Sequence, residues 1–197
     1  MMLNGDYMEL VFVRHGESEA NLPERVEGGF YCGRWNCALT EKGKLQARAL
    51  KDRADVCGAD VIFCSPLLRT RQTAAEFADR EITIDDRIIE RTLGDFDGKW
   101  KSELMENEEY KKYFTDPALA PFRSSFTVSA PHGESYADVV KRVTPFLSDL
   151  KNGDYKKVVI VSHAIAIKCM MKVLKNLTED ETLKFKVRQC EPMILDY

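Results

Sequence analysis

Apolar runs alternate with segments of helical periodicity along most of this chain. Five short runs rich in β-forming residues predict strands: Met8–Val13, Val61–Cys64, Ile82–Ile84, Val158–Val161 and Pro192–Leu195. Four segments between them place apolar residues three and four positions apart and predict helices: about Glu41–Arg53, Pro66–Ala78, Ser135–Leu150 and Ala164–Leu174. Strands that alternate with helices predict an α/β fold in which helices cover a sheet.

Two stretches interrupt this alternation. Residues Leu22–Leu39 hold three glycines among aromatic residues and predict a long loop. Residues Lys99–Ala130 are strongly charged at first and then contain proline and serine, which predicts a helical insertion followed by a loop. Long loops in compact domains often serve as lids or binding loops.

Composition limits the class of protein. The chain has 197 residues, of which 44% are apolar and 31% charged, and a net charge of −3. This length and balance predict a single globular domain. Because no basic stripe is present, neither a nucleic-acid partner nor an anionic membrane partner is expected. If the protein binds an anion, the positive charge must be concentrated in one pocket.

The six cysteines and the N-terminus indicate the compartment. No Cys-x-x-Cys pair and no Cys/His cluster with zinc spacing occurs, so we expect free thiols and no structural zinc. Residues Met1–Val13 lack the basic segment and the apolar length of a signal peptide. No apolar run approaches the roughly 18 residues of a membrane span. These features predict a cytoplasmic protein.

The most informative motif follows the first predicted strand. Arg14, His15 and Gly16 stand where the apolar run Met8–Val13 ends. Open α/β sheets bind ligands at the carboxyl edge of their strands. A glycine there allows close approach to a ligand or a positive φ. An imidazole beside a guanidinium suits a phosphate group.

Six motifs in order extend this observation over nearly the whole chain. They are RHGESEAN (14–21), TEKGKLQA (40–47), CSPLLRTRQTA (64–74), IIERTLGDFDG (88–98), PHGESYADVVKRVTPFL (131–147) and VVIVSHAIAIKCMM (158–171). Together they resemble the signature segments of the histidine phosphatase superfamily, also called phosphoglycerate mutase-like. The segment YCGRWNCALTEKG (31–43) resembles the matching loop of α-ribazole phosphatases more than that of glycolytic mutases.

The resemblance implies a fold. It is a three-layer α/β/α sandwich with a mostly parallel sheet and one antiparallel strand, in a single domain spanning residues 1–197. The stretch at about 99–130 is then a helical and loop insertion into that domain.

The resemblance also implies an active site. His15 is the expected nucleophile, because a neutral imidazole attacks a phosphate dianion without charge repulsion and forms a phosphohistidine. Which ring nitrogen attacks depends on the hydrogen bond of the other. Arg14 and Arg69 are expected to stabilise the transferring phosphoryl group, and His163 would contribute if it is protonated. Glu90 is the expected general acid and later base.

Other assignments are less direct. Asp95 and Asp97 are rivals to Glu90 for the acid role. The resemblance implies that Asn21, Cys32, Gly33, Arg91 and the backbone N–H of Ala164 bind substrate or phosphate, the last at a helix N-terminus. Ala164 stands where the family usually has glycine, and Asn36–Leu39 differs from the usual loop sequence.

Three functions remain open at this stage. The leading interpretation is a phosphatase that needs no cofactor and no metal and acts on a small phosphorylated metabolite. A phosphoglycerate mutase is the alternative, although the insertion is short and holds a single arginine, Arg123. The third is a non-catalytic module that binds phospho-ligands or proteins, which the presence of both His15 and Glu90 disfavours. The sequence specifies neither the phosphomonoester nor the oligomeric state, monomer or homodimer.

Overall fold

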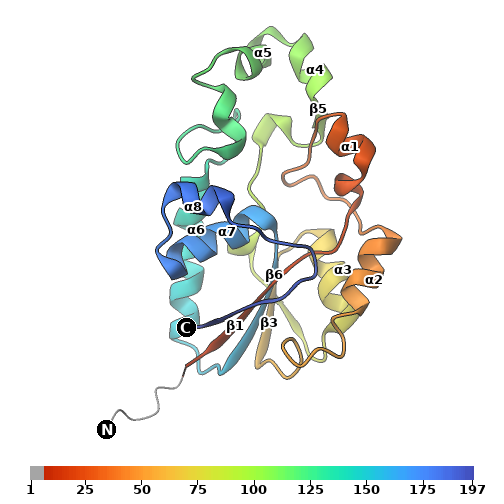
Figure 1. Cartoon of the computed structure of the whole chain (residues 1–197), viewed down its shortest axis with the longest axis vertical. Coiled ribbons are helices and arrows are strands. Elements are labelled where there is room, and N and C mark those ends of the chain that lie inside the picture. Colours follow the sequence, from red (N-terminus) through yellow and green to blue (C-terminus); the bar gives the residue numbers. More distant parts are fainter. Residues whose placement is uncertain (1–6) are drawn as a thin grey trace.

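The computed structural model describes residues 7–197 and contains a five-stranded sheet (Figure 1). Its strands are β1 (Glu9–Arg14), β3 (Val61–Cys64), β4 (Ile82–Ile84), β6 (Lys157–Ser162) and β7 (Met193–Asp196), in the order β4-β3-β6-β1-β7. All neighbours are parallel except β7, which pairs antiparallel with β1. All five predicted strands are therefore present, and the sheet is mostly parallel with one antiparallel strand, as expected. The prediction that Met1–Val13 is not a signal peptide concerns in part residues 1–6, which lie outside the described residues.

Helices cover both faces of the sheet. Helices α2 (Glu41–Arg48) and α3 (Leu68–Phe77) lie on one face, and α6 (Tyr136–Lys151) and α7 (Ala164–Lys175) lie on the other (Figure 1). The alternation of side chains along β1 explains this: Leu10 and Phe12 belong to the core under α6 and α7, whereas Val11 and Val13 belong to the core under α2 and α3. The three-layer α/β/α sandwich is confirmed.

One helix is shorter than its periodicity predicts. Thr40 caps α2 as expected, because its side chain accepts the N–H of Gly43 at 3.0 Å. The helix ends at Arg48 instead of continuing to Arg53, and the chain turns there through bonds such as Leu50 N–H to Ala47 O at 3.0 Å. Leu50 is nevertheless buried, so the apolar spacing correctly predicts burial but not helix length.

The two interrupting stretches pack together above the carboxyl ends of the strands (Figure 1). The first contains α1 (Pro23–Glu27) and β2 (Phe30–Tyr31), and the second contains β5 (Lys99–Trp100), α4 (Lys101–Glu106) and α5 (Glu108–Thr115). Strands β2 and β5 form a separate antiparallel pair. A third apolar cluster joins the stretches through Tyr31, Leu93, Phe96, Leu104, Phe122 and Ala130. We call this assembly the cap.

The remaining short elements lie in connecting segments. They are the 3₁₀ helices η1 (Glu19–Asn21), η2 (Asp86–Ile88), η3 (Gly94–Phe96) and η4 (Ala120–Ser124), and helix α8 (Glu179–Lys184). The sequence analysis missed α8, although Thr178 and Glu181 form a capping box at its start. Within residues 7–197, no helix is long and apolar enough to cross a membrane.

Candidate active site

Two glycines hold the loop after β1 against helix α2. A methyl group at Gly16 would crowd the carbonyl of Gly43, and one at Gly43 would overlap the carbonyl of Glu17. Gly16 also donates its N–H to Thr73 Oγ1 at 3.1 Å. The structure therefore requires glycine at position 16 for close packing of helix and loop, whereas the sequence suggested ligand approach or a positive φ. This packing places His15 rigidly at the end of β1.

The imidazole of His15 is held in one tautomer. Its Nδ1 lies 2.7 Å from the carbonyl oxygen of Gly16, which can only accept, so Nδ1 carries the proton. Nε2 is then the free nitrogen with a lone pair. Burial and the nearby Arg69 and Arg14 guanidiniums lower the pKa of His15 well below its ordinary value. The ring is therefore neutral at pH 7, and Nε2 is its unprotonated nitrogen.

Two arginines flank this imidazole. Arg69 is 2% exposed and donates from NH1 to Trp35 O at 2.8 Å and from NH2 to Gly33 O at 2.9 Å. Arg14 donates from NH1 to Val187 O at 3.0 Å, and its buried Nε has no hydrogen-bond partner among residues 7–197. The carbonyls orient both guanidiniums without neutralising them. Both charges thus remain available to an anion.

The second histidine packs against the first. The ring centroids of His163 and His15 are 5.2 Å apart, and Ser65 Oγ lies 2.7 Å from His163 Nε2. Burial and the same two arginines lower the pKa of His163 well below its ordinary value, so the free protein holds this ring neutral. In the unliganded site His163 is therefore not in the protonated form on which its predicted contribution depends. When Ser65 donates to Nε2, Nδ1 carries a proton and has no partner among the described residues.

The carboxylate of Glu90 sits at the N-terminus of α7. Its Oε1 accepts the N–H groups of Arg91 at 2.8 Å and Ala166 at 3.3 Å, and its Oε2 accepts the N–H of Ile165 at 3.3 Å. Two amides of the first turn of α7, those of Ile165 and Ala166, thus bind this side chain. The rival Asp95 bonds outward to His132 and Tyr110, and Asp97 bonds to Thr92. Of the three acids, only Glu90 lines the cavity described next.

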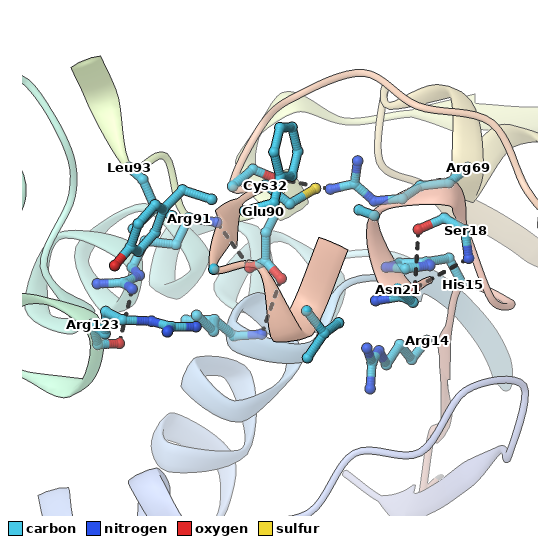
Figure 2. A pocket seen from close by; sticks show the side chains of 17 residues that line it. Arg14, His15, Ser18, Asn21, Cys32, Arg69, Glu90, Arg91, Leu93 and Arg123 are labelled. Atoms are coloured by element: carbon cyan, nitrogen blue, oxygen red, sulfur yellow. Dashed lines mark hydrogen bonds between the residues drawn. The ribbon is translucent and has the colours of Figure 1, made fainter. Parts of the chain in front are cut away.

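A cavity of about 290 Å³ is lined by Arg14, His15, Arg69 and Glu90, whereas the fully buried His163 does not line it. Figure 2 shows Arg14, His15 and Arg69 on one side, Arg123 on the other and Glu90 between them. Asn21, Cys32 and Gly33 also line the cavity, as the resemblance implied. Asn21 accepts three hydrogen bonds on Oδ1, two from Ser18 and one from Gln189, which aligns its amide nitrogen as a donor.

Two predicted phosphate ligands are placed differently. Arg91 lines the cavity, but its guanidinium donates to the carbonyls of Phe122 at 2.9 Å and Arg123 at 2.9 Å, so it fastens the cap to the site. Ala164 lies at the start of α7 and does not line the cavity; it borders a shallower hollow on the other side of Arg14. Phosphate binding by Arg91 and by the backbone N–H of Ala164 stays a prediction.

The sequence analysis missed a carboxylate that organises the site. Glu134, from the PHGES segment, accepts Arg34 NH2 at 3.0 Å, Arg142 Nε at 2.8 Å and the N–H of Thr92 at 3.1 Å. Arg34 in turn donates to Glu90 O at 2.9 Å. Glu134 therefore positions the backbone around Glu90. Its place directly before the helix N-cap Ser135 was the available signal.

Arg123 is the other residue whose role the sequence did not show. It is exposed, its guanidinium carbon lies 5.3 Å from the centre of the Tyr31 ring, and it lines the cavity opposite His15 (Figure 2). Among residues 7–197, no three His, Cys, Asp or Glu side chains gather to hold a metal ion. The positive charge of the site comes from arginine.

Comparison with known proteins agrees with this geometry. A family model described as "Histidine phosphatase superfamily (branch 1)" matches residues 10–197. Phosphoserine phosphatase 1 of Hydrogenobacter thermophilus is 35% identical over 169 residues, 83% of this chain and 74% of that protein. A 2,3-bisphosphoglycerate-dependent phosphoglycerate mutase of Methylobacterium radiotolerans is 31% identical over 199 residues, 94% of this chain and 87% of that protein. The crystal structure of an alpha-ribazole phosphatase from Shigella flexneri has a TM-score of 0.76 at 27% identity, covering 95% of this chain and 89% of the other.

Proposed function

Because the chain belongs to the histidine phosphatase superfamily (branch 1), we propose that it hydrolyses a small phosphomonoester through a phosphohistidine on His15. The observation that carries this proposal is the hydrogen bond from His15 Nδ1 to Gly16 O at 2.7 Å. That bond leaves Nε2 unprotonated, next to two arginines and in reach of a small cavity. A neutral nucleophile beside fixed cations suits attack on a phosphate dianion.

The first step transfers the phosphoryl group to the enzyme. The lone pair of His15 Nε2 attacks phosphorus while the bond to the ester oxygen breaks, and Glu90 delivers a proton to the leaving alkoxide. Charge on the three equatorial oxygens is stabilised by the guanidiniums of Arg14 and Arg69. The amide of Asn21 supplies a neutral donor from the cavity wall, and we propose the Nδ1–H of His163, whose ring packs against His15, as a second donor.

The second step returns the enzyme to its starting state. Glu90, now a carboxylate, takes a proton from a water molecule, whose oxygen attacks phosphorus while the bond to Nε2 breaks. Inorganic phosphate leaves and the proton stays on Glu90. The three backbone N–H groups around Glu90 keep the carboxyl in place through both steps.

The size and lining of the cavity support a small substrate. Its volume of about 290 Å³ is at the lower limit of ligand pockets. Apolar side chains of Phe30, Tyr31 and Leu93 form the wall opposite the phosphate-binding groups, together with Arg123. We propose a phosphorylated metabolite whose organic part fits this wall.

A phosphoglycerate mutase is the second candidate, because several relatives bear that name. A mutase must keep water from the phosphoenzyme until a second hydroxyl arrives. The cap contributes a single arginine of the insertion, Arg123, to the cavity, which argues against a clamp for a bisphosphate.

Two assays on the same protein preparation distinguish the phosphatase from the mutase. Phosphate release from a panel of phosphorylated metabolites is measured beside isomerisation of 3-phosphoglycerate. We expect phosphate release to be faster, with no activation by 2,3-bisphosphoglycerate. Isomerisation that exceeds phosphate release and depends on the bisphosphate would contradict the phosphatase proposal.

A further inference from the structure

A second hollow lies on the other side of Arg14 from the active-site cavity. Its volume is about 720 Å³, against about 290 Å³ for the cavity, and Arg14 is the one lining residue that the two share. The segment between α8 and β7 forms a wall of this hollow, and Arg14 donates from NH1 to Val187 O in that segment at 3.0 Å (Figure 1). The proposed phosphoryl-transfer steps take place in the cavity, so the second hollow has no part in them.

The lining of this hollow is strongly positive. One carboxylate, Glu191, and five cations line it: Arg14, Lys168, Lys184, Lys186 and Arg188. Lys184 pairs with Asp180 at 2.6 Å, and Arg188 pairs with Glu191 at 3.3 Å. The other three cations form no ion pair among residues 7–197, and Lys168 is held by a carbonyl instead, that of Leu183 at 2.6 Å from Nζ. Three of the five charges are therefore not neutralised, and we call this site the basic hollow.

The backbone of the segment after α8 explains this concentration of charge. Lys184, Lys186 and Arg188 stand at alternate positions and are exposed, whereas Val187 between them is buried. The segment continues into Gln189, which forms an isolated parallel bridge with Arg14 at the end of β1. Alternate side chains of an extended chain point to the same side, so the three basic side chains gather on one wall. The ends of β1 and α7 complete the basic hollow.

We propose that the basic hollow binds a compact polyanion with two or more phosphate groups, and that this ligand weakens phosphomonoester binding in the cavity. Exposed cations bind a singly charged ion weakly because water and salt screen them, so several cations around one hollow favour a ligand that carries several charges close together. The basic wall spans five residues and the net charge is −3, which disfavours a long nucleic acid. The two ligands share the charge of Arg14, so each weakens the binding of the other.

The test uses inorganic tripolyphosphate and the intact protein in calorimetric titrations at low ionic strength. A double variant, Lys186→Ala with Arg188→Ala, removes two exposed cations of the basic hollow that have no part in catalysis. We expect it to bind tripolyphosphate about tenfold more weakly than the parent protein. Inorganic phosphate, which fits the cavity, should bind both proteins with nearly equal affinity. The control is Arg80→Ala with Lys156→Ala, which removes two exposed cations before β4 and β6, at the opposite edge of the sheet, and should bind as the parent does.

Kinetics test the coupling between the two sites. Tripolyphosphate should raise KM for p-nitrophenyl phosphate with the parent protein and the control, and the double variant should need about tenfold more of it for the same effect while keeping its basal activity. Equal affinity of the parent and the double variant for tripolyphosphate would overturn the proposal, because the polyanion would then bind outside the basic hollow; so would no binding by the parent. The kinetic arm rests on the proposed function, whereas the titrations need no turnover. A protein without phosphatase activity would contradict the proposed function and leave the calorimetric result standing.

Discussion

Replacing Glu90 by glutamine tests the assignment of the general acid. The substitution keeps the size of the side chain and removes the proton that the leaving group needs. In the structure Oε1 accepts two backbone N–H groups and Oε2 accepts one, from Ile165 at 3.3 Å. The glutamine oxygen can retain the first two bonds, whereas its NH₂ group faces the N–H of Ile165. One hydrogen bond is lost and the N–H of Ile165 then faces another donor, which costs about 1–3 kcal/mol of stability.

The catalytic loss should depend on the leaving group. General acid catalysis typically contributes about 10²- to 10⁴-fold, so we expect a loss of that size for an alkyl phosphate. p-Nitrophenolate leaves without help, so its phosphate ester should lose about tenfold or less. The assay measures kcat/KM for both substrates with the parent protein and Glu90→Gln, beside urea unfolding to account for the lost hydrogen bond. Glu90→Asp keeps a carboxyl group and serves as the matched control. It should lose less kcat/KM on the alkyl phosphate than Glu90→Gln does.

An equal loss on both substrates would refute this reasoning. It would mean that Glu90 holds the start of α7 in place, through the N–H groups of Ile165 and Ala166, without transferring a proton.

Three further predictions follow from the charges of the site. Because the pKa values of His15 and His163 are lowered by folding, the unfolded chain binds more protons than the folded one below pH 6.5. Urea unfolding should therefore show that the free energy of unfolding falls by about 1.4 kcal/mol per pH unit for each histidine as the pH drops from 6.5, and His163→Gln should make this fall less steep. Arg14 and Arg69 supply the positive charge, so activity should survive excess EDTA, and loss that a divalent ion restores would show a different way of neutralising the phosphate. Arg123→Ala should raise KM about tenfold for phosphomonoesters that carry a carboxylate and leave p-nitrophenyl phosphate nearly unchanged; equal effects on both would remove Arg123 from substrate recognition.

The core of the fold was predictable because its signal is local. The apolar run around Phe12 and Val13 indicates a strand buried on both faces, and the helical spacing of Val139 and Val143 indicates the covered face of α6. The cap was not predictable from periodicity. Its elements are two to eight residues long, and they become stable only when the cluster around Phe96 joins two stretches that are far apart in the sequence.

The site was predictable as far as residue type determines role. His15 and Glu90 line one cavity as expected, because the ends of β1 and the segment before the cap meet at one edge of the sheet. Arg91 shows the limit of this reasoning. Its guanidinium donates hydrogen bonds to the carbonyls of Phe122 and Arg123, which are more than thirty residues away in the sequence, and no local sequence pattern predicts that contact. The protonation of His163 likewise depends on burial and neighbouring charges that only the folded arrangement brings together.

Trapping the phosphoenzyme tests the central claim most directly. The protein is mixed with ³²P-labelled substrate, quenched in alkali, digested and mapped, and the labelled histidine is compared with standards of the two phosphohistidine isomers. Since Nδ1 of His15 is bound to Gly16 O, the label should sit on Nε2 of His15, be labile in acid and be absent from His15→Ala. Label on Ser18, label on Nδ1, or full turnover by His15→Ala would contradict the account.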